Sequence, residues 1–209
     1  MDWLVTIVSL IVAYLLGSIP TSVWVGKFFY NIDVRTKGSG NAGATNTIRV
    51  LGYKAGVPVL IFDILKGILA ILIVSYVLPD HLLDYHNYFK IAAGLLAVIG
   101  HIFPVFARFN GGKGVATIAG VAIALYPFAL LVILGIFILM MVLFNYVSLA
   151  SITSAIAFPF VVYFGFHETN YGLIGLAILV AIFIPLTHKK NIQRLLKGEE
   201  SKFFKKRKP

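Results

Sequence analysis

The sequence contains no cysteine and few charged residues. Its 209 residues include 8 Asp and Glu residues, and charged residues make up 12% of the total. The lack of cysteine excludes disulfide bonds and thiolate metal ligands, and it leaves the redox compartment unreadable. A soluble domain carries about 25% charged residues, so an ordinary water-soluble globule is disfavoured. The histidines are dispersed at positions 81, 86, 101, 167 and 188, and we therefore expect no metal site.

Long apolar runs dominate the chain, of which 59% is hydrophobic. The runs from Leu4 to Val25 and from Val57 to Leu78 each hold about 20 residues, enough to cross about 30 Å of hydrocarbon. Because lipid offers no hydrogen-bond partners, each backbone polar group must be satisfied within its segment, and we expect helices. The N-terminus carries Asp2 but no basic residue before the first run, so we interpret it as an uncleaved helix rather than a signal peptide.

Four further apolar runs follow, and one of them is too long for a single crossing. They extend over about residues 89–106, 115–144, 149–166 and 171–185. The run at 115–144 would form a helix of about 45 Å, too long to span a bilayer without a steep tilt. Pro127 lies near its middle. Because proline breaks a helix interior, we expect two shorter helices there.

The basic residues fall into three groups. Of the 18 Lys and Arg residues, 16 lie in the first polar segment, in the loop with Arg108 and Lys113, or in the C-terminal tail. An excess of Lys and Arg marks the cytoplasmic side of a membrane protein, so we expect all three groups on that side. This needs an even number of crossings between Lys113 and His188, which the break at Pro127 provides. The sequence thus predicts an all-α integral membrane protein with seven transmembrane helices, an outside N-terminus and a cytoplasmic C-terminus.

We expect a single polytopic domain over residues 1–209. Its cytoplasmic motif segments lie at about 35–54, 108–117 and 188–200, and a basic tail occupies 201–209. All three motif segments are expected on one side of the membrane, where they could converge on one site. Since the positive charge stands in short loops that set topology, we expect no nucleic-acid binding.

The first motif segment is rich in glycine and small polar residues. It reads Lys37-Gly38-Ser39-Gly40-Asn41-Ala42-Gly43-Ala44-Thr45-Asn46, and Arg49 follows it. Its G-x-G-x-x-G spacing does not indicate a dinucleotide fold, because it follows a membrane span rather than a strand. Backbone N–H groups and hydroxyls of such a loop suit an oxyanion; a flexible polar turn is the alternative. The candidate phosphate ligands are Gly38, Gly40, Asn41, Thr45 and Asn46.

The second motif segment opens the fourth span. It reads Asn110-Gly111-Gly112-Lys113-Gly114-Val115-Ala116-Thr117, and it is not a Walker A loop because Gly114 replaces the required Ser or Thr. Glycines that lead into a helix N-terminus still place free N–H groups and the positive end of the dipole where a phosphate can bind. Lys113 adds a compact cation. The candidate phosphate ligands are Gly111, Gly112, Gly114 and Thr117; a helix cap with a topology-setting lysine is the alternative.

The third motif segment ends the last span with His188, Asn191 and Arg194. If the helix continues, these residues recur every three positions and share one face. An interfacial histidine without a catalytic role is the alternative for His188.

Asp63 and Lys66 form an unusual pair, because they lie three residues apart inside a membrane span. Ionisable groups are costly there and are usually functional. We interpret the two as a structural ion pair, with Lys66 extending toward the cytoplasm. A functional role remains the alternative.

The motifs occur in a specific order between the apolar spans: GSGNAGATN, GHIFPVFARFNGGKGVAT, VSLASITS and HKKNIQRLLKGEE. In this order they resemble the bacterial acyl-phosphate:glycerol-3-phosphate acyltransferase family, PlsY, from the first span to Glu200. The resemblance implies a seven-helix enzyme of the bacterial cytoplasmic membrane whose active site faces the cytoplasm. It implies transfer of a fatty acyl group from acyl phosphate to glycerol 3-phosphate without a cofactor. The implied products are 1-acyl-glycerol 3-phosphate (lysophosphatidic acid) and inorganic phosphate, in the first acylation step of phospholipid synthesis.

The resemblance also implies roles for individual residues. It implies that Ser39 and Arg49 are essential, that the GGKG glycines and Lys113 bind phosphate, and that His188 and Asn191 belong to the active site. Glu199 is implied as structural. The implied partners are glycerol 3-phosphate, acyl phosphate, membrane lipids and the enzyme that supplies the acyl phosphate.

Two questions stay open at the level of sequence. Acyl phosphate carries its own leaving group, so the protein mainly needs to position the acceptor hydroxyl and stabilise oxyanions. Either a substrate phosphate or His188 could then accept the hydroxyl proton. A transporter of phosphorylated metabolites would need polar groups through the full membrane depth, whereas here they crowd one side. A different lipid-phosphate enzyme is the remaining alternative.

Overall fold

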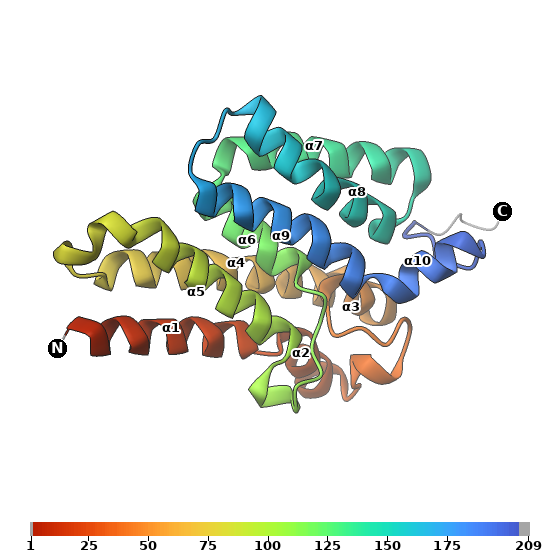
Figure 1. The fold of residues 1–209 in the computed structure, drawn as a ribbon. Helices are drawn as coiled ribbons and strands as arrows, with labels where there is room; N and C mark the ends of the chain where they lie inside the picture. The colour runs from red at the N-terminus through yellow and green to blue at the C-terminus, as the bar shows by residue number, and fades with distance from the viewer. Residues whose placement is uncertain (1, 205–209) are drawn as a thin grey trace. The chain divides into compact units, whose positions relative to one another are not determined.

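The computed structural model describes residues 2–204, and within that range every regular element is helical. The all-α class expected from the apolar runs is therefore confirmed. Of the expected basic tail, residues 205–209 lie outside the described residues. The helices, shown in Figure 1, are α1 (Asp2–Ser18), α2 (Thr21–Tyr30), α3 (Ala44–Leu51), α4 (Tyr53–Val77), α5 (His86–Ile102), α6 (Val115–Leu125), α7 (Pro127–Phe144), α8 (Val147–Phe160), α9 (Tyr171–Thr187) and α10 (Lys189–Leu196).

The chain forms two compact units where the sequence suggested one domain. The first unit comprises residues 1–125 and holds α1 to α6; the second comprises residues 126–209 and holds α7 to α10.

Four segments within the described residues are long and apolar enough to cross a membrane alone. They are Tyr53–Val77, His86–Ala107, Pro127–Phe144 and Val147–Gly165. Two bent pairs, α1 with α2 and α9 with α10, bring the number to 6 if each pair is one span. Helix α6 has only 11 residues, about 17 Å of helix. The structure thus supports an integral membrane protein with several spans, and the count of seven stays a prediction.

Proline divides two of the apolar runs. Helix α6 ends at Leu125 and α7 begins with Pro127, which confirms the break expected in the long run. Proline is tolerated at a helix start because the N–H that it lacks would have no helical partner there. The first run was expected to be one helix from Leu4 to Val25, and this was wrong. Helix α1 ends at Ser18, Pro20 precedes α2, and the two axes differ by 45°.

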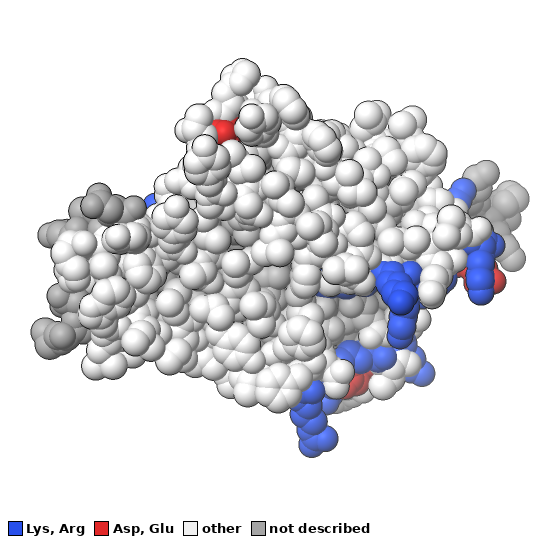
Figure 2. Space-filling model, viewed as in Figure 1, with Lys and Arg blue, Asp and Glu red and all other residues white. Residues whose placement is uncertain are grey.

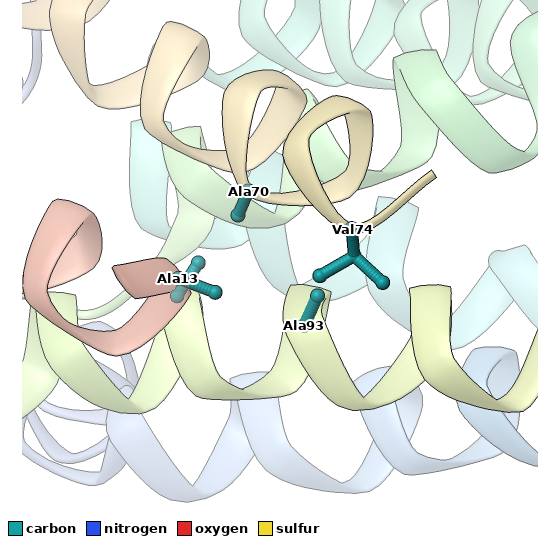
Figure 3. Close-up of a cluster of buried hydrophobic side chains, with 5 residues drawn as sticks. Ala13, Ala70, Val74 and Ala93 are labelled. Carbon is teal, nitrogen blue, oxygen red and sulfur yellow. The ribbon is translucent and has the colours of Figure 1, made fainter. Parts of the chain in front are cut away.

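Small side chains allow the helices of the first unit to approach closely. A buried cluster, shown in Figure 3, joins Ala13 of α1, Ala70 and Val74 of α4, and Ala93 and Ala97 of α5. Lipid tails are as apolar as leucine, so association of membrane helices depends on close packing and small residues rather than on the hydrophobic effect.

Glycines mark the two closest helix crossings of this unit. A methyl group at Gly100 of α5 would collide with the Tyr14 carbonyl of α1. A methyl group at Gly120 of α6 would collide with the Ile64 carbonyl of α4. At both crossings backbone therefore lies directly against backbone, which fixes the ends of α5 and α6 relative to their neighbours.

The second unit is held together by contacts around Tyr126. Its hydroxyl donates a hydrogen bond to the Leu173 carbonyl at 2.6 Å, and its ring packs edge-on against Phe158 with centroids 5.1 Å apart. Of the most apolar window of α7, only 11% is buried, as expected of a helix that faces lipid. Figure 2 shows that the visible surface is mostly uncharged, with Lys and Arg gathered in patches rather than spread along the helices.

Candidate anion-binding site

The first glycine loop (residues 37–43) is shaped by one buried side chain, that of Asn46 on α3. Its Oδ1 accepts a hydrogen bond from the backbone N–H of Ser39 at 2.8 Å. Its Nδ2 donates to the carbonyls of Val34 at 2.8 Å and Lys37 at 3.1 Å. Asn46 was predicted as a phosphate ligand, but its whole amide is used inside the loop. We therefore assign it a positioning role instead.

Two glycines give this loop its path. Gly38 has φ +62° and Gly40 has φ +74°, a region that residues with a side chain rarely occupy. A methyl group at Gly38 would also collide with the Oδ1 of Asn46. Gly40 is exposed, and Ser39 between the two glycines is half-buried. The turn thus presents Ser39 at the surface of the loop.

An arginine missed in the sequence joins the two glycine loops. Arg35 binds both carboxylate oxygens of Asp33, at 3.0 and 2.8 Å. Its third nitrogen, Nη1, donates to the carbonyls of Ala107 at 3.1 Å and Asn110 at 3.4 Å. The hydrogen bond from Arg35 holds the pKa of Asp33 well below its usual range, although burial opposes this effect. The ion pair is bidentate and charged, so it fixes the Arg35 guanidinium firmly. The hydrogen bonds of Nη1 then join the two segments.

The second glycine loop (residues 110–114) folds back on the end of α5. The N–H groups of Gly111 and Gly112 donate to the carbonyls of Ile102 and His101, both at 3.1 Å. A methyl group at Gly112 would collide with Nε2 of His101 and would lie 2.7 Å from the carbonyl oxygen of Ala42 in the first loop. The two loops are therefore in direct contact, and the expected convergence of the first two motif segments is confirmed.

A pocket with a volume of about 570 Å³ opens beside this contact. It is lined by Arg35, Gly40, Ile102, Phe103, Arg108, Phe109, Asn110 and Gly111. One glycine from each loop and two arginines thus face the same space. Exposed backbone and guanidinium groups are the chemistry that binds phosphate.

The predicted cations lie at the edges of the loops. Arg49 is half-buried on α3, and among residues 2–204 its guanidinium has no ion pair or side-chain hydrogen bond. Lys113 is half-buried within the second loop, and Gly114 ends that loop with φ +81°. Asn41, inside the first loop, and Thr45, shortly after it, are also half-buried.

Thr117 does not lie at the surface of the loops. Its side chain is fully buried in α6, and its hydroxyl finds no hydrogen-bond partner among the described residues. A buried hydroxyl cannot touch a ligand held by the loops in this conformation, so its predicted phosphate contact lacks structural support.

Asp63 and Lys66 form a buried ion pair with a nitrogen–oxygen distance of 2.6 Å, as expected. The side chain of Lys66 is only 6% exposed, so its ammonium group is satisfied within the protein rather than by solvent. Its Nζ donates instead to the Ile19 carbonyl at 2.5 Å. That carbonyl lies at the break between α1 and α2, where it also accepts a hydrogen bond from the backbone N–H of Thr21 at 3.0 Å.

In the second unit, one carboxylate gathers three side chains. Glu200 accepts hydrogen bonds from Ser148 at 2.8 Å and Asn191 at 2.6 Å, and its other oxygen accepts from Arg194 at 2.8 Å. Burial alone would raise the pKa of Glu200, but the hydrogen bonds from Asn191 and Ser148 and the charge of Arg194 lower it. Glu199, the residue expected to be structural, is exposed. The contacts belong to its neighbour, which the sequence analysis missed.

His188 stands at the bend of 61° between α9 and α10. Its side chain is buried, and its Nδ1 lies 2.8 Å from the Ile184 carbonyl. A carbonyl only accepts, so Nδ1 carries a proton and donates it to this bond. Asn191 and Arg194 share one face, as expected, since both bind Glu200.

Apolar helices that carry two apposed glycine loops define an integral membrane protein with a candidate anion site. Comparison with known proteins gives the family. The model of the glycerol-3-phosphate acyltransferase family matches residues 7–198. The chain belongs to this family and is an acyltransferase, which confirms the resemblance found in the sequence.

Individual relatives match along almost the whole chain. A glycerol-3-phosphate acyltransferase of Fusobacterium nucleatum is 45% identical over 194 residues, which cover 93% of this chain and 96% of the relative. One of Chlorobium chlorochromatii is 42% identical over 221 residues, covering 92% and 94%.

Two solved structures have the same fold. The crystal structure of PlsY, an integral membrane glycerol 3-phosphate acyltransferase, in its glycerol 3-phosphate form superimposes with a TM-score of 0.84 at 36% identity. It covers 95% of this chain and 96% of that one. The lysophosphatidic acid form gives a TM-score of 0.79 and covers 94% of each chain.

Proposed function

We propose that this acyltransferase takes its acyl group from acyl phosphate and transfers it to glycerol 3-phosphate. The products are 1-acyl-glycerol 3-phosphate and inorganic phosphate, and the reaction is the first acylation step of bacterial phospholipid synthesis. The contact between the two glycine loops beside the arginine-lined pocket supports this most directly. Both substrates are phosphates, and the related PlsY is described in forms with glycerol 3-phosphate and lysophosphatidic acid.

The chemistry needs little beyond positioning. The C1 hydroxyl oxygen of glycerol 3-phosphate forms a bond to the acyl carbon. The bond from that carbon to the phosphate oxygen breaks, and its electron pair leaves with the phosphate. The hydroxyl proton passes to a substrate phosphate, whose second pKa is about 6. Holding the two reactants in line and stabilising the oxyanion then supply most of the rate.

Different residues of the first unit bind the phosphate groups and neutralise their charge. Ser39 and the two glycine loops frame the phosphate. Because the N–H groups of Gly111 and Gly112 already donate to the end of α5, Arg49 and Lys113 bind the phosphate oxygens and neutralise the charge that develops on them. The unpaired guanidinium of Arg49 is suited to this, because no carboxylate among the described residues neutralises it. We further propose that His188 and Asn191 hydrogen-bond a substrate. Within the second unit, Glu200 fixes the amide of Asn191.

The enzyme is proposed to cross the bacterial cytoplasmic membrane seven times, with its N-terminus outside and its site facing the cytoplasm. The grouping of 16 of the 18 Lys and Arg residues supports this topology. Seven crossings require α6 to count as one, so the loop residues before it must occupy part of the membrane depth. The enzyme that supplies acyl phosphate is a partner expected at the same membrane surface.

The direct test incubates the purified protein with labelled glycerol 3-phosphate and each of three donors. Acyl phosphate should yield lysophosphatidic acid, and acyl-CoA and acyl carrier protein should yield none. Arg49→Ala should abolish the reaction, whereas Lys54→Ala, a matched exposed cation at the start of α4, should retain it. Acylation from acyl-CoA alone, or equal loss in both variants, would contradict the proposal.

A further inference from the structure

A network of buried polar side chains lies inside the first unit, within the apolar helices. The Asp63 Oδ1 accepts hydrogen bonds from the Thr21 hydroxyl at 3.1 Å and from Lys66 at 2.6 Å. Nδ1 of His101 lies 3.7 Å from the same oxygen. The four side chains are all less than a tenth exposed, and they come from α2, α4 and α5.

Stability alone does not account for this network. Charged groups inside a membrane protein are expensive, and well-packed apolar residues can replace a buried ion pair without loss of stability. One part of it has a local purpose, because Lys66 binds the Ile19 carbonyl exposed by the helix break. The histidine is not needed for that purpose, so its presence calls for another explanation.

His101 connects the network to the second glycine loop. The Nδ1 atom of its ring faces Asp63. The Nε2 atom lies so close to Gly112 that a methyl group on Gly112 would collide with it. Its backbone carbonyl accepts the hydrogen bond from the Gly112 N–H. His101 thus contacts the second glycine loop with both its side chain and its backbone.

We propose that His101 is a positioning residue for the acyl transfer, with Asp63, Lys66 and Thr21 as the support that fixes its ring. It holds Gly112, and with it Lys113 and the rest of the second glycine loop, in the position that the substrate requires. The inference rests on the proposed function of this loop. It assigns to the buried ion pair a part in substrate binding in addition to the capping of α1.

The first experiment measures kcat and KM for glycerol 3-phosphate in His101→Ala and His101→Gln. His101→Ala should lower kcat/KM on the order of 10- to 100-fold, the usual effect of a small misplacement of a binding group, mainly through KM. His101→Gln returns a polar atom near the position of Nε2 and should recover part of the loss. The matched control is His86→Asn, at the other end of α5, which should keep wild-type KM.

The second experiment separates positioning from folding. Removal of Asp63 or Lys66 alone leaves an unpaired buried charge, so each single variant should unfold at lower temperature. The double variant D63N/K66M removes both charges and should regain much of the thermal stability, yet its KM for glycerol 3-phosphate should stay raised several-fold. Wild-type KM in the folded double variant, or in His101→Ala, would overturn the inference.

Calorimetric binding of glycerol 3-phosphate to the purified protein needs no donor. If the wild-type protein fails to use acyl phosphate, the proposed donor is wrong, and the binding measurement still tests His101. Weaker binding in His101→Ala than in His86→Asn supports the inference; equal binding overturns it.

Discussion

The side-chain oxygen of Asn46 accepts a hydrogen bond from the backbone N–H of Ser39 at 2.8 Å. This bond reaches from the first turns of α3 to the middle of the first glycine loop. The proposed phosphate-binding serine is therefore held in place by a residue that does not itself touch the phosphate.

Replacement of Asn46 should destabilise the first glycine loop, and more so when more of the hydrogen bonds of the Asn46 side chain are lost. Asn46→Ala leaves the Ser39 N–H without its acceptor, at about 1–3 kcal/mol for a buried group. It also removes one donor from each of the carbonyls of Val34 and Lys37, which keep their backbone donors. Asn46→Asp keeps the acceptor but places a negative charge against the carbonyls of Val34 and Lys37, so it should be no better. Both Asn46 variants should have a lower unfolding temperature and a lower rate of acyl transfer. Asn87→Ala, at an exposed position, should change neither quantity. Wild-type activity in Asn46→Asp would contradict this assignment.

The second glycine loop should not tolerate a methyl group. Gly112→Ala forces the loop away from His101 and Ala42, so we expect a raised KM for glycerol 3-phosphate. Gly135→Ala in α7 is the matched control, since nothing lies within 4 Å of its added methyl. Lys113→Ala should raise the barrier by about 2–4 kcal/mol, as loss of an oxyanion donor does. Unchanged kinetics in folded Gly112→Ala and Lys113→Ala would refute the phosphate-binding role.

Glu200 should make the second unit sensitive to acid. Its pKa is lower in the folded protein, so its stabilising effect is fully present above the ordinary glutamate pKa of about 4.3. The effect is lost as pH falls through the lower, folded pKa. Thermal unfolding between pH 7 and pH 3 should show this loss in the wild type. Glu200→Gln should cost about 1–3 kcal/mol at neutral pH and lack that acid dependence, while exposed Glu199→Gln should behave as wild type.

His188 should position a substrate rather than act as an obligatory base. His188→Asn and His188→Gln each retain a donor and an acceptor and should keep far more activity than His188→Ala. Asparagine can also reproduce the bond from Nδ1 to the Ile184 carbonyl. The acidic limb of the pH–rate profile should survive in both, because it belongs to the substrate phosphate. If both are as inactive as alanine and added imidazole restores turnover, His188 is the base.

The topology can be tested cleanly because the chain has no native cysteine. Single cysteines at Lys37, Asn110 or Lys202 should resist impermeant thiol reagents in intact cells. A cysteine at Asn87, exposed at the start of α5, should react. Reaction at Asn110 with protection at Asn87 would rule out the proposed orientation.

Much of the fold follows from the sequence, because an apolar run of bilayer length leaves the backbone little choice but a helix. The division at Pro127 could be inferred from the excessive length of its run. The division at Pro20 could not, since the run that contains it has the right length for one span. What distinguishes it is Lys66, far along the chain, which satisfies the carbonyl of Ile19.

The sequence indicated which segments form the candidate site, but it did not indicate which side chains contact one another there. Glycine-rich segments with cations indicated the two loops, yet nothing local identifies Arg35 as the clamp between them. The roles of Asn46 and His101 likewise depend on partners from distant segments. Glu199 and Glu200 are adjacent acids, and only the fold of the chain beyond α10 decides which of them meets Asn191 and Arg194.

The contact of Gly120 with the Ile64 carbonyl has a consequence for the register of α6. Gly120 lies between one and two helical turns after Gly114, the last residue of the second glycine loop, and each residue turns a helix by about 100°. Deletion of one residue between Gly114 and Gly120 would therefore rotate the second glycine loop by about 100° around the axis of α6. The contact at Gly120 would still hold α6 against α4. The contact at Gly120 therefore fixes the direction in which the loop faces. We expect the connection between α4 and α5 to vary in length among relatives, and the segment from Gly114 to Gly120 to keep its length.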